Sequence, residues 1–548
     1  MGAGQTPKSG TPGLFCSLIQ CAFSVRLFST FIQPFNHGIL MSQLPDYVAS
    51  AQPNSRENRA GWLMTTAASY AGVMLWFAFW QDVPSGGQSF LGGILTQGLG
   101  LAIAAVVVAA FLCHFLCYVV PGMLGMKTGL SLTVVGTSTF GVKGGFIMPG
   151  FLMGALQFGW LSVNAYFAGM LLAGMAGHAA GSLVHHAISI AWIVLATFVG
   201  MKGVRYVGAV ASFTPILPII VLALLLVNTI GGVGSFDKTR MVKDIEAKKP
   251  RLVETLAASD ALPVSDAKKL DAEKYGFIKG QSVAQPVTLY GSGFLGVLSL
   301  TCAYIIGFFA TAGAAGVGFC SNNKDGAAVQ KGGLVGIVLA TSLTGIIALI
   351  AFAGFSKNVY EDAPTLYRVT DLLQAILGDN LGKTCMLMLA LAAFPSACFP
   401  TVVAADAFKT TFPKINPLIT CGIGVLAAII LSVTGLAGKA GDVFTVVGAS
   451  FGPICGAMAA DYLLAGRKWA GPREGFNLPG WIAWFFGFIV GGATLVLTKF
   501  LGMTMPFEIP CPPLSAFIVG FVLYALFALI GLQSKVLDMP QRIDVEGN

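Results

Sequence analysis

The stretch Ile305-Ile-Gly-Phe-Phe-Ala-Thr-Ala-Gly-Ala-Ala-Gly-Val-Gly-Phe319 is apolar along almost its whole length, yet four glycines interrupt it. They are Gly307, Gly313, Gly316 and Gly318. A membrane helix tolerates one glycine, but four in a single span predict a helix that unwinds and exposes backbone groups to a ligand. The alternative is that these glycines let neighbouring helices pack closely.

A second interrupted segment lies in the first strongly apolar stretch, from Gly61 to Trp80. There Gly72 breaks the run Ala-Ala-Ser-Tyr-Ala-Gly-Val-Met-Leu-Trp. Broken segments at corresponding positions of two halves point to a binding site near the bilayer midplane of secondary carriers. Close packing explains either segment alone equally well, but the pair together favours a binding site.

The composition excludes a water-soluble globular domain. Hydrophobic residues make up 55% of the chain and charged residues 10%, with a mean hydropathy of +0.78. These values are typical of a polytopic membrane protein. The net charge of +8 comes from basic residues scattered singly between apolar runs, which is typical of cytoplasmic loops and does not indicate nucleic acid. The eleven cysteines form no CxxC pair and show no zinc-site spacing, so we interpret them as small buried residues.

Apolar runs long enough to cross a membrane recur along the chain. With about 20 residues per crossing, the sequence predicts roughly twelve spans. They are residues 61–81, 91–119, 145–175, 181–200, 204–230, 290–318, 332–355, 384–408, 416–437, 443–464, 480–502 and 513–533. Lys and Arg are more frequent in the short loops on the side of the termini, which predicts that both termini are cytoplasmic. We expect the chain to lie in the plasma (inner) membrane.

Ionisable residues do not converge at depth in the predicted spans, as catalysis inside a bilayer would require. We therefore do not expect an enzyme. His114, His185, His186, Asp406 and Asp461 each stand near or within a span, and we interpret them as interfacial or capping residues in preference to proton relays.

One predicted span carries a polar stripe. Gln157, Trp160 and Asn164 follow i, i+3, i+7 spacing and share one helical face. Two amides and an indole suit a flat heterocycle, because amides offer paired donors and acceptors and the indole offers a stacking face. The alternative is that the amides bond to neighbouring helices and the indole fills a gap.

Four motifs stand in order along the chain: Ser138-Thr-Phe-Gly-Val-Lys-Gly-Gly145, the Gln157/Gly159/Trp160 pattern, Gly307-Phe-Phe-Ala-Thr-Ala-Gly313 and Phe451-Gly-Pro-Ile-Cys-Gly-Ala-Met-Ala-Ala-Asp-Tyr462. Together they resemble the nucleobase:cation symporter-1 family of cytosine, purine, uracil, allantoin and hydantoin permeases, over nearly all of residues 57–465. The third motif looks most similar to cytosine permease.

The resemblance implies an all-α polytopic protein with a leucine-transporter-like fold. Residues 57–465 would form ten core helices, arranged as two inverted five-helix repeats, with an extracytoplasmic insert at about 234–286. Residues 466–548 would add two peripheral helices and a short cytoplasmic tail. Residues 1–56 are expected to be partly disordered, with Met41 as an alternative start. The amphipathic stretch 361–377 predicts a lid or a helix lying on the membrane surface.

The resemblance also implies a substrate site. Trp160 and Phe309, or Phe308 if the alignment shifts by one residue, would sandwich a heterocycle. Gln157 and Asn164 would read its polar edge. The backbone around Gly307 and the nearby Thr311 would complete the site, together with Cys398, which stands close to the position where the family commonly has an Asn.

No cofactor is expected beyond a coupling cation. A sodium site in such carriers lies between the first and eighth helices, and it maps to the carbonyls of Met74 and Phe77 and to Ser396. With a single hydroxyl there, sodium and proton coupling both stay open. The expected function is the import of a nucleobase or related heterocycle, with the lipid bilayer and the small molecule as partners. The alternatives are a carrier of the same fold for an amino acid or polyamine, and a membrane sensor that binds without transporting.

Overall fold

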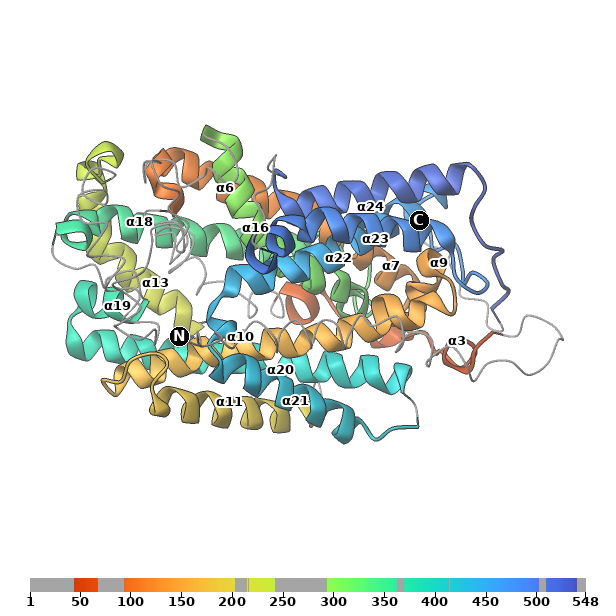
Figure 1. Ribbon diagram of the computed structural model, residues 1–548, viewed down its shortest axis with the longest axis horizontal. Coiled ribbons are helices and arrows are strands. Elements are labelled where there is room, and N and C mark those ends of the chain that lie inside the picture. The colour runs from red at the N-terminus through yellow and green to blue at the C-terminus, as the bar shows by residue number, and fades with distance from the viewer. Residues whose placement is uncertain are drawn as a thin grey trace, which may run out of the picture. The chain divides into compact units, whose positions relative to one another are not determined.

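The computed structural model describes residues 44–67, 93–202, 214, 216–241, 293–361, 369–412, 414–501 and 509–539 (Figure 1). The chain divides into two compact units, Met1–Gln43 and Leu44–Asn548. The first unit lies outside the described residues, so the following account concerns the second unit. The predicted helix break at Gly72 and the predicted insert beyond residue 241 also lie outside them.

Helices account for nearly all the described residues, because each backbone N–H and C=O in a membrane must be hydrogen bonded within its own segment. Ten of these helices are long and apolar enough to cross a membrane. In chain order they are Leu99–Thr128 (α6 Leu99–Leu112, η5 Cys113–Tyr118, α7 Val119–Thr128), Phe146–Met175 (η6 Phe146–Phe151, α10 Leu152–Met175), α11 Leu183–Met201, Ile216–Ser235 (α13 Ile216–Thr229, η7 Ile230–Ser235), α16 Gly293–Cys320, Gly326–Phe355 (α17 Gly326–Gly333, η9 Leu334–Leu339 and most of α18 Ala340–Glu361), α20 Asp379–Thr411, α22 Ala440–Leu464, Leu478–Leu497 (α23 Leu478–Thr494 and the start of η11 Leu495–Phe500) and α24 Pro512–Leu529.

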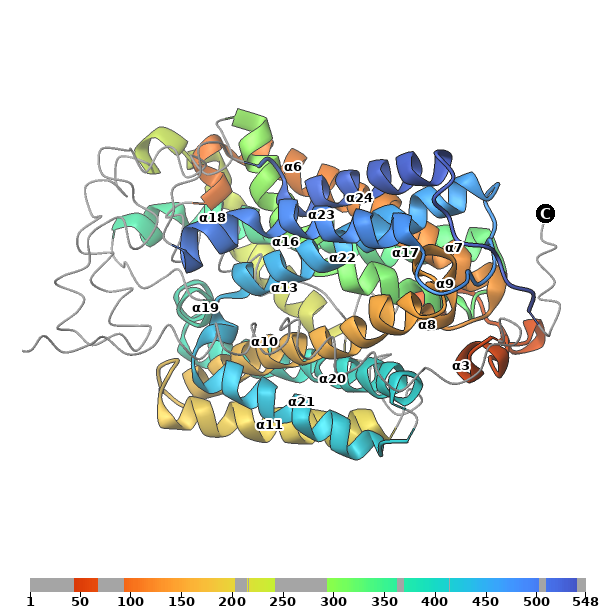
Figure 2. The ribbon, with the colours of Figure 1, turned by 45° about the vertical axis from the view of Figure 1, so that its right-hand side comes forward.

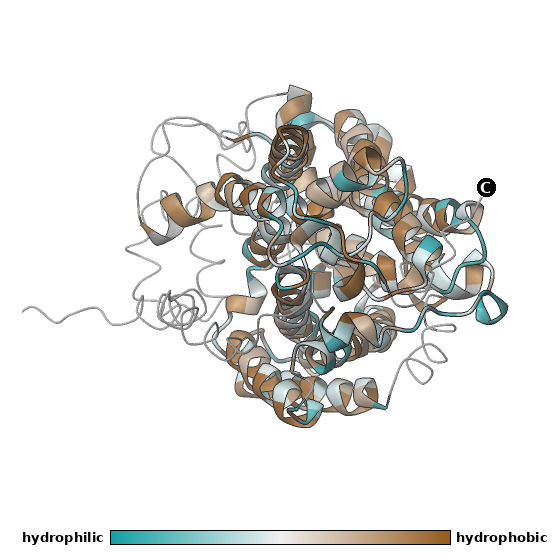
Figure 3. Cartoon of the chain, turned by 90° about the vertical axis from the view of Figure 1, so that its right-hand side faces the viewer, coloured by the Kyte–Doolittle hydropathy of each residue, from teal (hydrophilic) through white to brown (hydrophobic). Residues whose placement is uncertain are grey.

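A shorter apolar helix, α21 Pro417–Val433, matches an eleventh predicted span. Of the first predicted span, 61–81, only η3 Leu63–Ala67 is described. The all-helical fold class is confirmed, and the two β-bridges among the described residues are isolated ones. Hydrophobic residues run along the helices throughout (Figure 3).

The helices divide into central and peripheral ones. In α16 and α22 the most apolar windows are 78% and 83% buried, against 28% in Ile216–Ser235. α10 packs with α11, α20 and α21, which we call the α10 group. α16 packs with α6, η5 and α7 and, on another side, with α22, which in turn carries α23 and α24 (Figures 1 and 2).

The glycine-rich span does not unwind. α16 is one continuous helix from Gly293 to Cys320, and its glycines all have negative φ. A Cβ on Gly307 would lie 2.7 Å from the carbonyl oxygen of Phe444, and one on Gly313 would lie 2.6 Å from that of Cys117. These two glycines therefore let α22 and η5 approach the α16 backbone closely. The prediction of a broken helix is wrong for α16, because the helix is continuous through all four glycines, and Gly307 and Gly313 serve close packing.

The described part of the amphipathic stretch forms α19, Val369–Leu377. Its apolar side packs against protein, since Leu372 and Leu373 are fully buried and α19 contacts α20 and α13. A helix lying on the membrane surface would instead turn that side toward lipid. The surface-helix prediction is therefore wrong for Val369–Leu377, and residues 362–368 of the predicted stretch lie outside the described residues.

Candidate functional site

Three aromatic side chains from different helices meet between the α10 group and α16. Trp160 of α10 stacks on Phe444 of α22, with ring centroids 5.1 Å apart and planes 29° apart. Phe308 of α16 meets the indole edge-on, at 4.5 Å and 73°, and also contacts Phe444 at 5.7 Å and 88°. We call Trp160, Phe308 and Phe444 the aromatic cluster. Such offset and edge-to-face pairs are the favoured aromatic geometries.

A hydrogen bond fixes the indole within this cluster. The Nε1–H of Trp160 donates to Oγ1 of Thr311, at 2.9 Å. Thr311 is buried on α16, three residues after Phe308, so the two side chains share one face of that helix. The bond joins α10 directly to α16. The predicted residues Trp160, Phe308 and Thr311 are thus brought together.

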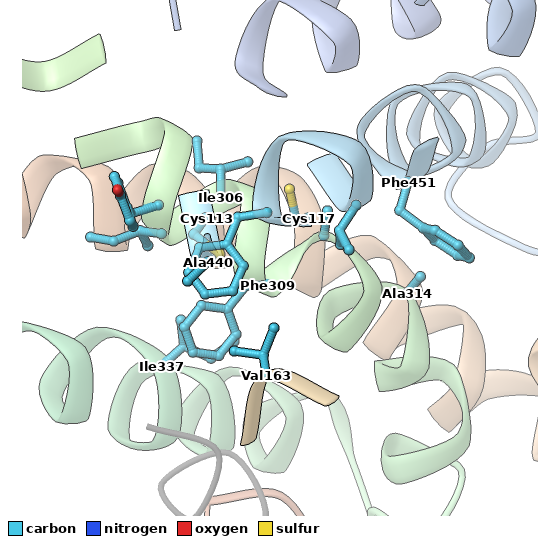
Figure 4. Packing of buried hydrophobic residues seen from close by; sticks show 14 of the residues in the cluster. Cys113, Cys117, Val163, Ile306, Phe309, Ala314, Ile337, Ala440 and Phe451 are labelled. Carbon is cyan, nitrogen blue, oxygen red and sulfur yellow. The ribbon is translucent and has the colours of Figure 1, made fainter. Parts of the chain in front are cut away.

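The structure separates the two phenylalanines that the sequence offered as stacking partners. Phe309 is fully buried, within the apolar core shown in Figure 4. Phe308 and Trp160 are both partly exposed. A ligand can contact only ring surface that is accessible, so Phe308 is the better placed of the two.

Gln157 and Asn164 differ in their partners although they share a helical face. The amide of Gln157 donates to Sδ of Met153, at 3.2 Å, and a thioether is a weak acceptor. Asn164 instead donates to the carbonyl of Ala393 and to Oγ of Ser396, at 3.1 and 3.0 Å. Its own oxygen accepts from Nε1 of Trp192, at 3.1 Å. Asn164 therefore ties α10 to α20 and α11.

The predicted α20 residues face protein groups. The hydroxyl of Ser396 donates to the carbonyl of Ala393, at 2.8 Å, besides accepting from Asn164. The thiol of Cys398 is buried and donates to the carbonyl of Phe394, at 3.3 Å, within its own helix. The other two predicted sodium ligands, Met74 and Phe77, lie outside the described residues.

Sequence reasoning missed Phe444 as a member of the cluster. It begins a predicted span, but nothing local distinguishes it among the 40 phenylalanines of the chain. Gly307 supplies the indirect signal, because its missing side chain is what allows the backbone of Phe444 to reach α16. That signal becomes readable only once the two helices are known to be neighbours.

A second polar centre lies at the end of α22. Asp461 is buried and forms an ion pair with Arg473, with Oδ1 and Nη2 3.2 Å apart. Its carboxylate also accepts from Ser138, at 2.6 Å, and from the hydroxyl of Tyr524, at 2.7 Å. We call Asp461, Arg473, Ser138 and Tyr524 the ion-pair cluster. The predicted interfacial or capping position of Asp461 is wrong, because the residue is a buried anchor.

The ion-pair cluster joins two of the motifs that carried the family resemblance. Ser138 begins the first motif, and Asp461 stands one residue before the end of the last. The guanidinium of Arg473 also donates through Nε to the carbonyl of Ser138, at 2.8 Å. The two motifs thus form one structural unit that fastens α22 to the segment before α10.

The segment that leads into the first predicted span is hydrogen bonded to the ends of two other helices, α7 and α16. The guanidinium of Arg59 donates to the carbonyls of Met126 and Asn54, and burial lowers the pKa of Arg59. The amide of Asn323, just past α16, is hydrogen bonded with Thr65 and Thr66. These bonds hold residues 54–66 against the ends of α7 and α16.

Comparison with solved structures identifies the arrangement. The structure of Mhp1, a nucleobase-cation-symport-1 family transporter, in a closed conformation with bromovinylhydantoin bound, matches with a TM-score of 0.56 and 14% identity, over 89% of this chain and 97% of that chain. The inward-facing conformation of Mhp1 matches with a TM-score of 0.54 and 14% identity, over 88% and 92%. The chain has the leucine-transporter-like fold. No protein-family model and no curated protein sequence matches the chain. At 14% identity the likeness to Mhp1 establishes the fold alone.

Proposed function

We propose that this chain is a cation-coupled secondary transporter, similar to the nucleobase:cation symporter-1 carriers, that imports a nucleobase or related flat heterocycle. The observation that carries the proposal is the aromatic cluster. Its two partly exposed rings, Trp160 of the α10 group and Phe308 of α16, lie at an angle to each other. A planar ring system that stacks on one ring and meets the edge of the other would contact α10 and α16 at once.

The polar neighbours of the cluster suit such a ligand. Among the described residues the Gln157 amide is held by the weak bond to Met153, so it can turn toward a ligand at small cost and offer both a donor and an acceptor. The three bonds of Asn164 assign it instead to holding α10 in register with α20 and α11. In this proposal Gln157 reads the edge of the heterocycle, while Asn164 positions the helix that carries Gln157 and Trp160.

The same contacts suggest how binding is linked to movement. The Trp160–Thr311 hydrogen bond joins α10 to α16, so any rocking of the α10 group against α16 must strain or break this bond. A ligand in contact with both Trp160 and Phe308 would add to this connection in some conformations more than in others. Only such differential binding can shift the population of the conformations. Alternating access to the two sides of the membrane follows if the shift closes one side and opens the other.

The test is the thermal stability of the purified protein with cytosine, uracil, hypoxanthine, allantoin, a hydantoin and several amino acids, each with and without sodium. A ligand that binds the native state raises the melting temperature by mass action. We expect a rise with at least one heterocycle. A rise with an amino acid and none with any heterocycle would refute the heterocycle assignment.

Two matched variants locate the site. Trp160→Ala removes the stacking ring and its bond to Thr311, while Trp484→Ala removes an equally large ring and its bond to the carbonyl of Ser450 between α23 and α22. Aromatic stacking on a base contributes about 1–3 kcal/mol, which corresponds to a roughly fivefold to hundredfold change in Kd. We expect a weakening in this range in Trp160→Ala and unchanged affinity in Trp484→Ala. Equal effects of the two variants would place the ligand elsewhere.

A further inference from the structure

His114 lies deep in a membrane span and points into the protein. It stands near the middle of the span Leu99–Thr128, and its side chain is fully buried. Its neighbours Phe111 and Phe115 are 41% and 54% exposed, so they mark the outer face of the helix. An ionisable residue at this depth is costly and is usually functional. The predicted interfacial position of His114 is therefore wrong.

Among the described residues, one nitrogen of the His114 imidazole has a hydrogen-bond partner and the other has none. Nε2 lies 3.1 Å from Oε1 of Gln330 on α17. Because an amide oxygen can only accept, Nε2 carries the hydrogen and Nδ1 of the neutral ring carries the lone pair. Nδ1 is buried and has no hydrogen-bond partner among the described residues. His185 offers a contrast, since its Nδ1 accepts from the amide of Gly181 and its Nε2 donates to the carbonyl of Tyr166.

The surroundings of the ring would favour a positive charge once water can reach it. Tyr118 stacks on the imidazole at 5.6 Å and 30°, and Phe115 meets it edge-on at 4.9 Å. Aromatic rings attract a cation over their faces. Gly333 makes the space, because a Cβ there would lie 2.5 Å from Nδ1.

Other titratable groups belong to η5 or to the elements packed against it, and most are thiols or phenols, which are uncharged between pH 5 and 8 in their ordinary state. Of the two lysines among them, Lys331 is exposed on α17 and Lys127 donates to the carbonyl of Arg467. Asp325 caps the start of α17 through the amide of Ala328. The thiols, phenols and lysines are Cys113, Cys117, Tyr118, Cys302, Tyr304, Cys320, Cys455, Tyr462, Lys127 and Lys331. α22 also carries two carboxylates, Asp442 in its first turn and Asp461 in the ion-pair cluster.

The backbone at this point is irregular on both sides. η5, which contains His114, and η9, which begins after Gly333, are both π-helical and pack against each other. Such π-helical turns are rare and are concentrated at functional sites. The His114–Gln330 bond therefore crosses the contact between two helices that are each locally distorted.

We propose that His114 is a proton-binding site of this carrier, which accepts a proton at Nδ1 in conformations that open the contact between η5 and η9. The inference deepens the proposed function, since it names the proton as a coupled ion. In the present conformation Nδ1 is sealed from water, which favours the neutral ring. Acid therefore shifts the population away from this conformation, because the proton binds the opened state more tightly.

The experiment follows the ring nitrogens of the protein labelled with ¹⁵N-histidine in lipid membranes, between pH 5 and 8. The chain has five histidines, and the His114 signal is assigned by its loss in His114→Gln. We expect the His114 signal to titrate in this range while the His185 signal, bonded at both nitrogens, does not. A His114 signal that stays neutral across the range would overturn the proposal.

A charge variant at Gln330 distinguishes a proton site from a merely structural hydrogen bond, and it leaves His114 itself unchanged. In Gln330→Glu a carboxylate faces the imidazole, which should raise the midpoint of the His114 titration by about one pH unit or more. Gln330→Leu, the control, should not raise it. An unchanged midpoint in Gln330→Glu would overturn the proposal. The titration needs no transported substrate, so failure of the heterocycle panel together with a titrating His114 would refute the proposed function and leave the proton site standing.

Discussion

The aromatic cluster and the ion-pair cluster both include a residue of α22, but their polar groups differ in how completely they are hydrogen bonded. In the ion-pair cluster the Asp461 carboxylate is bound by Arg473, Ser138 and Tyr524. In the aromatic cluster one bond, from Trp160 to Thr311, crosses from α10 to α16, and Gln157 is held weakly. Dense, complete bonding resists movement, whereas sparse bonding at a junction permits it. The difference suggests which end of α22 is an anchor and which faces the moving parts.

Loss of the anchor should have the largest effect. Asp461→Ala leaves the Arg473 guanidinium buried and unpaired, which should lower the free energy of unfolding by about 3–5 kcal/mol. The exposed pair Asp379–Lys383, 2.8 Å apart with side chains 63% and 37% exposed, is the control. Asp379→Ala should cost under about 1 kcal/mol. Thermal unfolding in detergent measures both variants. Similar melting temperatures for the two would show that the ion-pair cluster is not an anchor.

Close packing on α16 should come next. Gly313→Ala places a Cβ 2.6 Å from the carbonyl oxygen of Cys117 and should destabilise the protein by about 1–3 kcal/mol. Gly318→Ala is the matched control, because nothing lies within 4 Å of its Cβ, and it should be neutral or slightly stabilising. Melting temperatures compare the two. A tolerated Gly313→Ala would show that this glycine is not required for the close approach of η5 to α16.

The smallest effect is expected at the junction itself. Thr311→Val keeps the shape of the side chain but removes the acceptor for the Trp160 indole, which should cost about 0.5–1.5 kcal/mol of stability. If the bond favours this conformation over others, transport rates should change more than stability does. Uptake into proteoliposomes and thermal unfolding, measured on the same preparation, give the ratio. Lost stability with an unchanged rate would make the bond merely structural.

Much of the architecture was predictable. Each of the eleven later predicted spans has a helix in the described part of the chain, because a run of about 20 apolar residues has few stable alternatives in lipid. Two differ clearly in their bounds: the span predicted at 91–119 is Leu99–Thr128, and the one predicted at 204–230 is described only from Ile216 to Ser235. The stripe of Gln157, Trp160 and Asn164 was also visible, since helical spacing fixes which residues share a face. Its division into a weakly held Gln157 and a fully bonded Asn164 was not, because that depends on α11 and α20.

The errors share one cause. The glycines of α16 and the isolated ionisable residues His114 and Asp461 were judged from their own spans. Their roles are set by helices far away in sequence: Gly313 by Cys117, His114 by Gln330, and Asp461 by Arg473, Ser138 and Tyr524. A single span shows that a residue is small or charged, but not what it will meet.

The sequence by itself determined that the chain is a helical membrane protein and predicted about twelve spans, because hydrophobicity and length act locally against a bilayer of fixed thickness. Ten of them are helices long and apolar enough to cross a membrane in the described part of the chain. It also determined which side chains share a helical face, because the helix period is fixed. Only the tertiary structure decided that Phe308 and not Phe309 accompanies Trp160 with an accessible ring, that Phe444 joins them, and that no described residue bonds to Nδ1 of His114. These facts depend on how distant helices pack, and packing is a property of the whole assembly of helices.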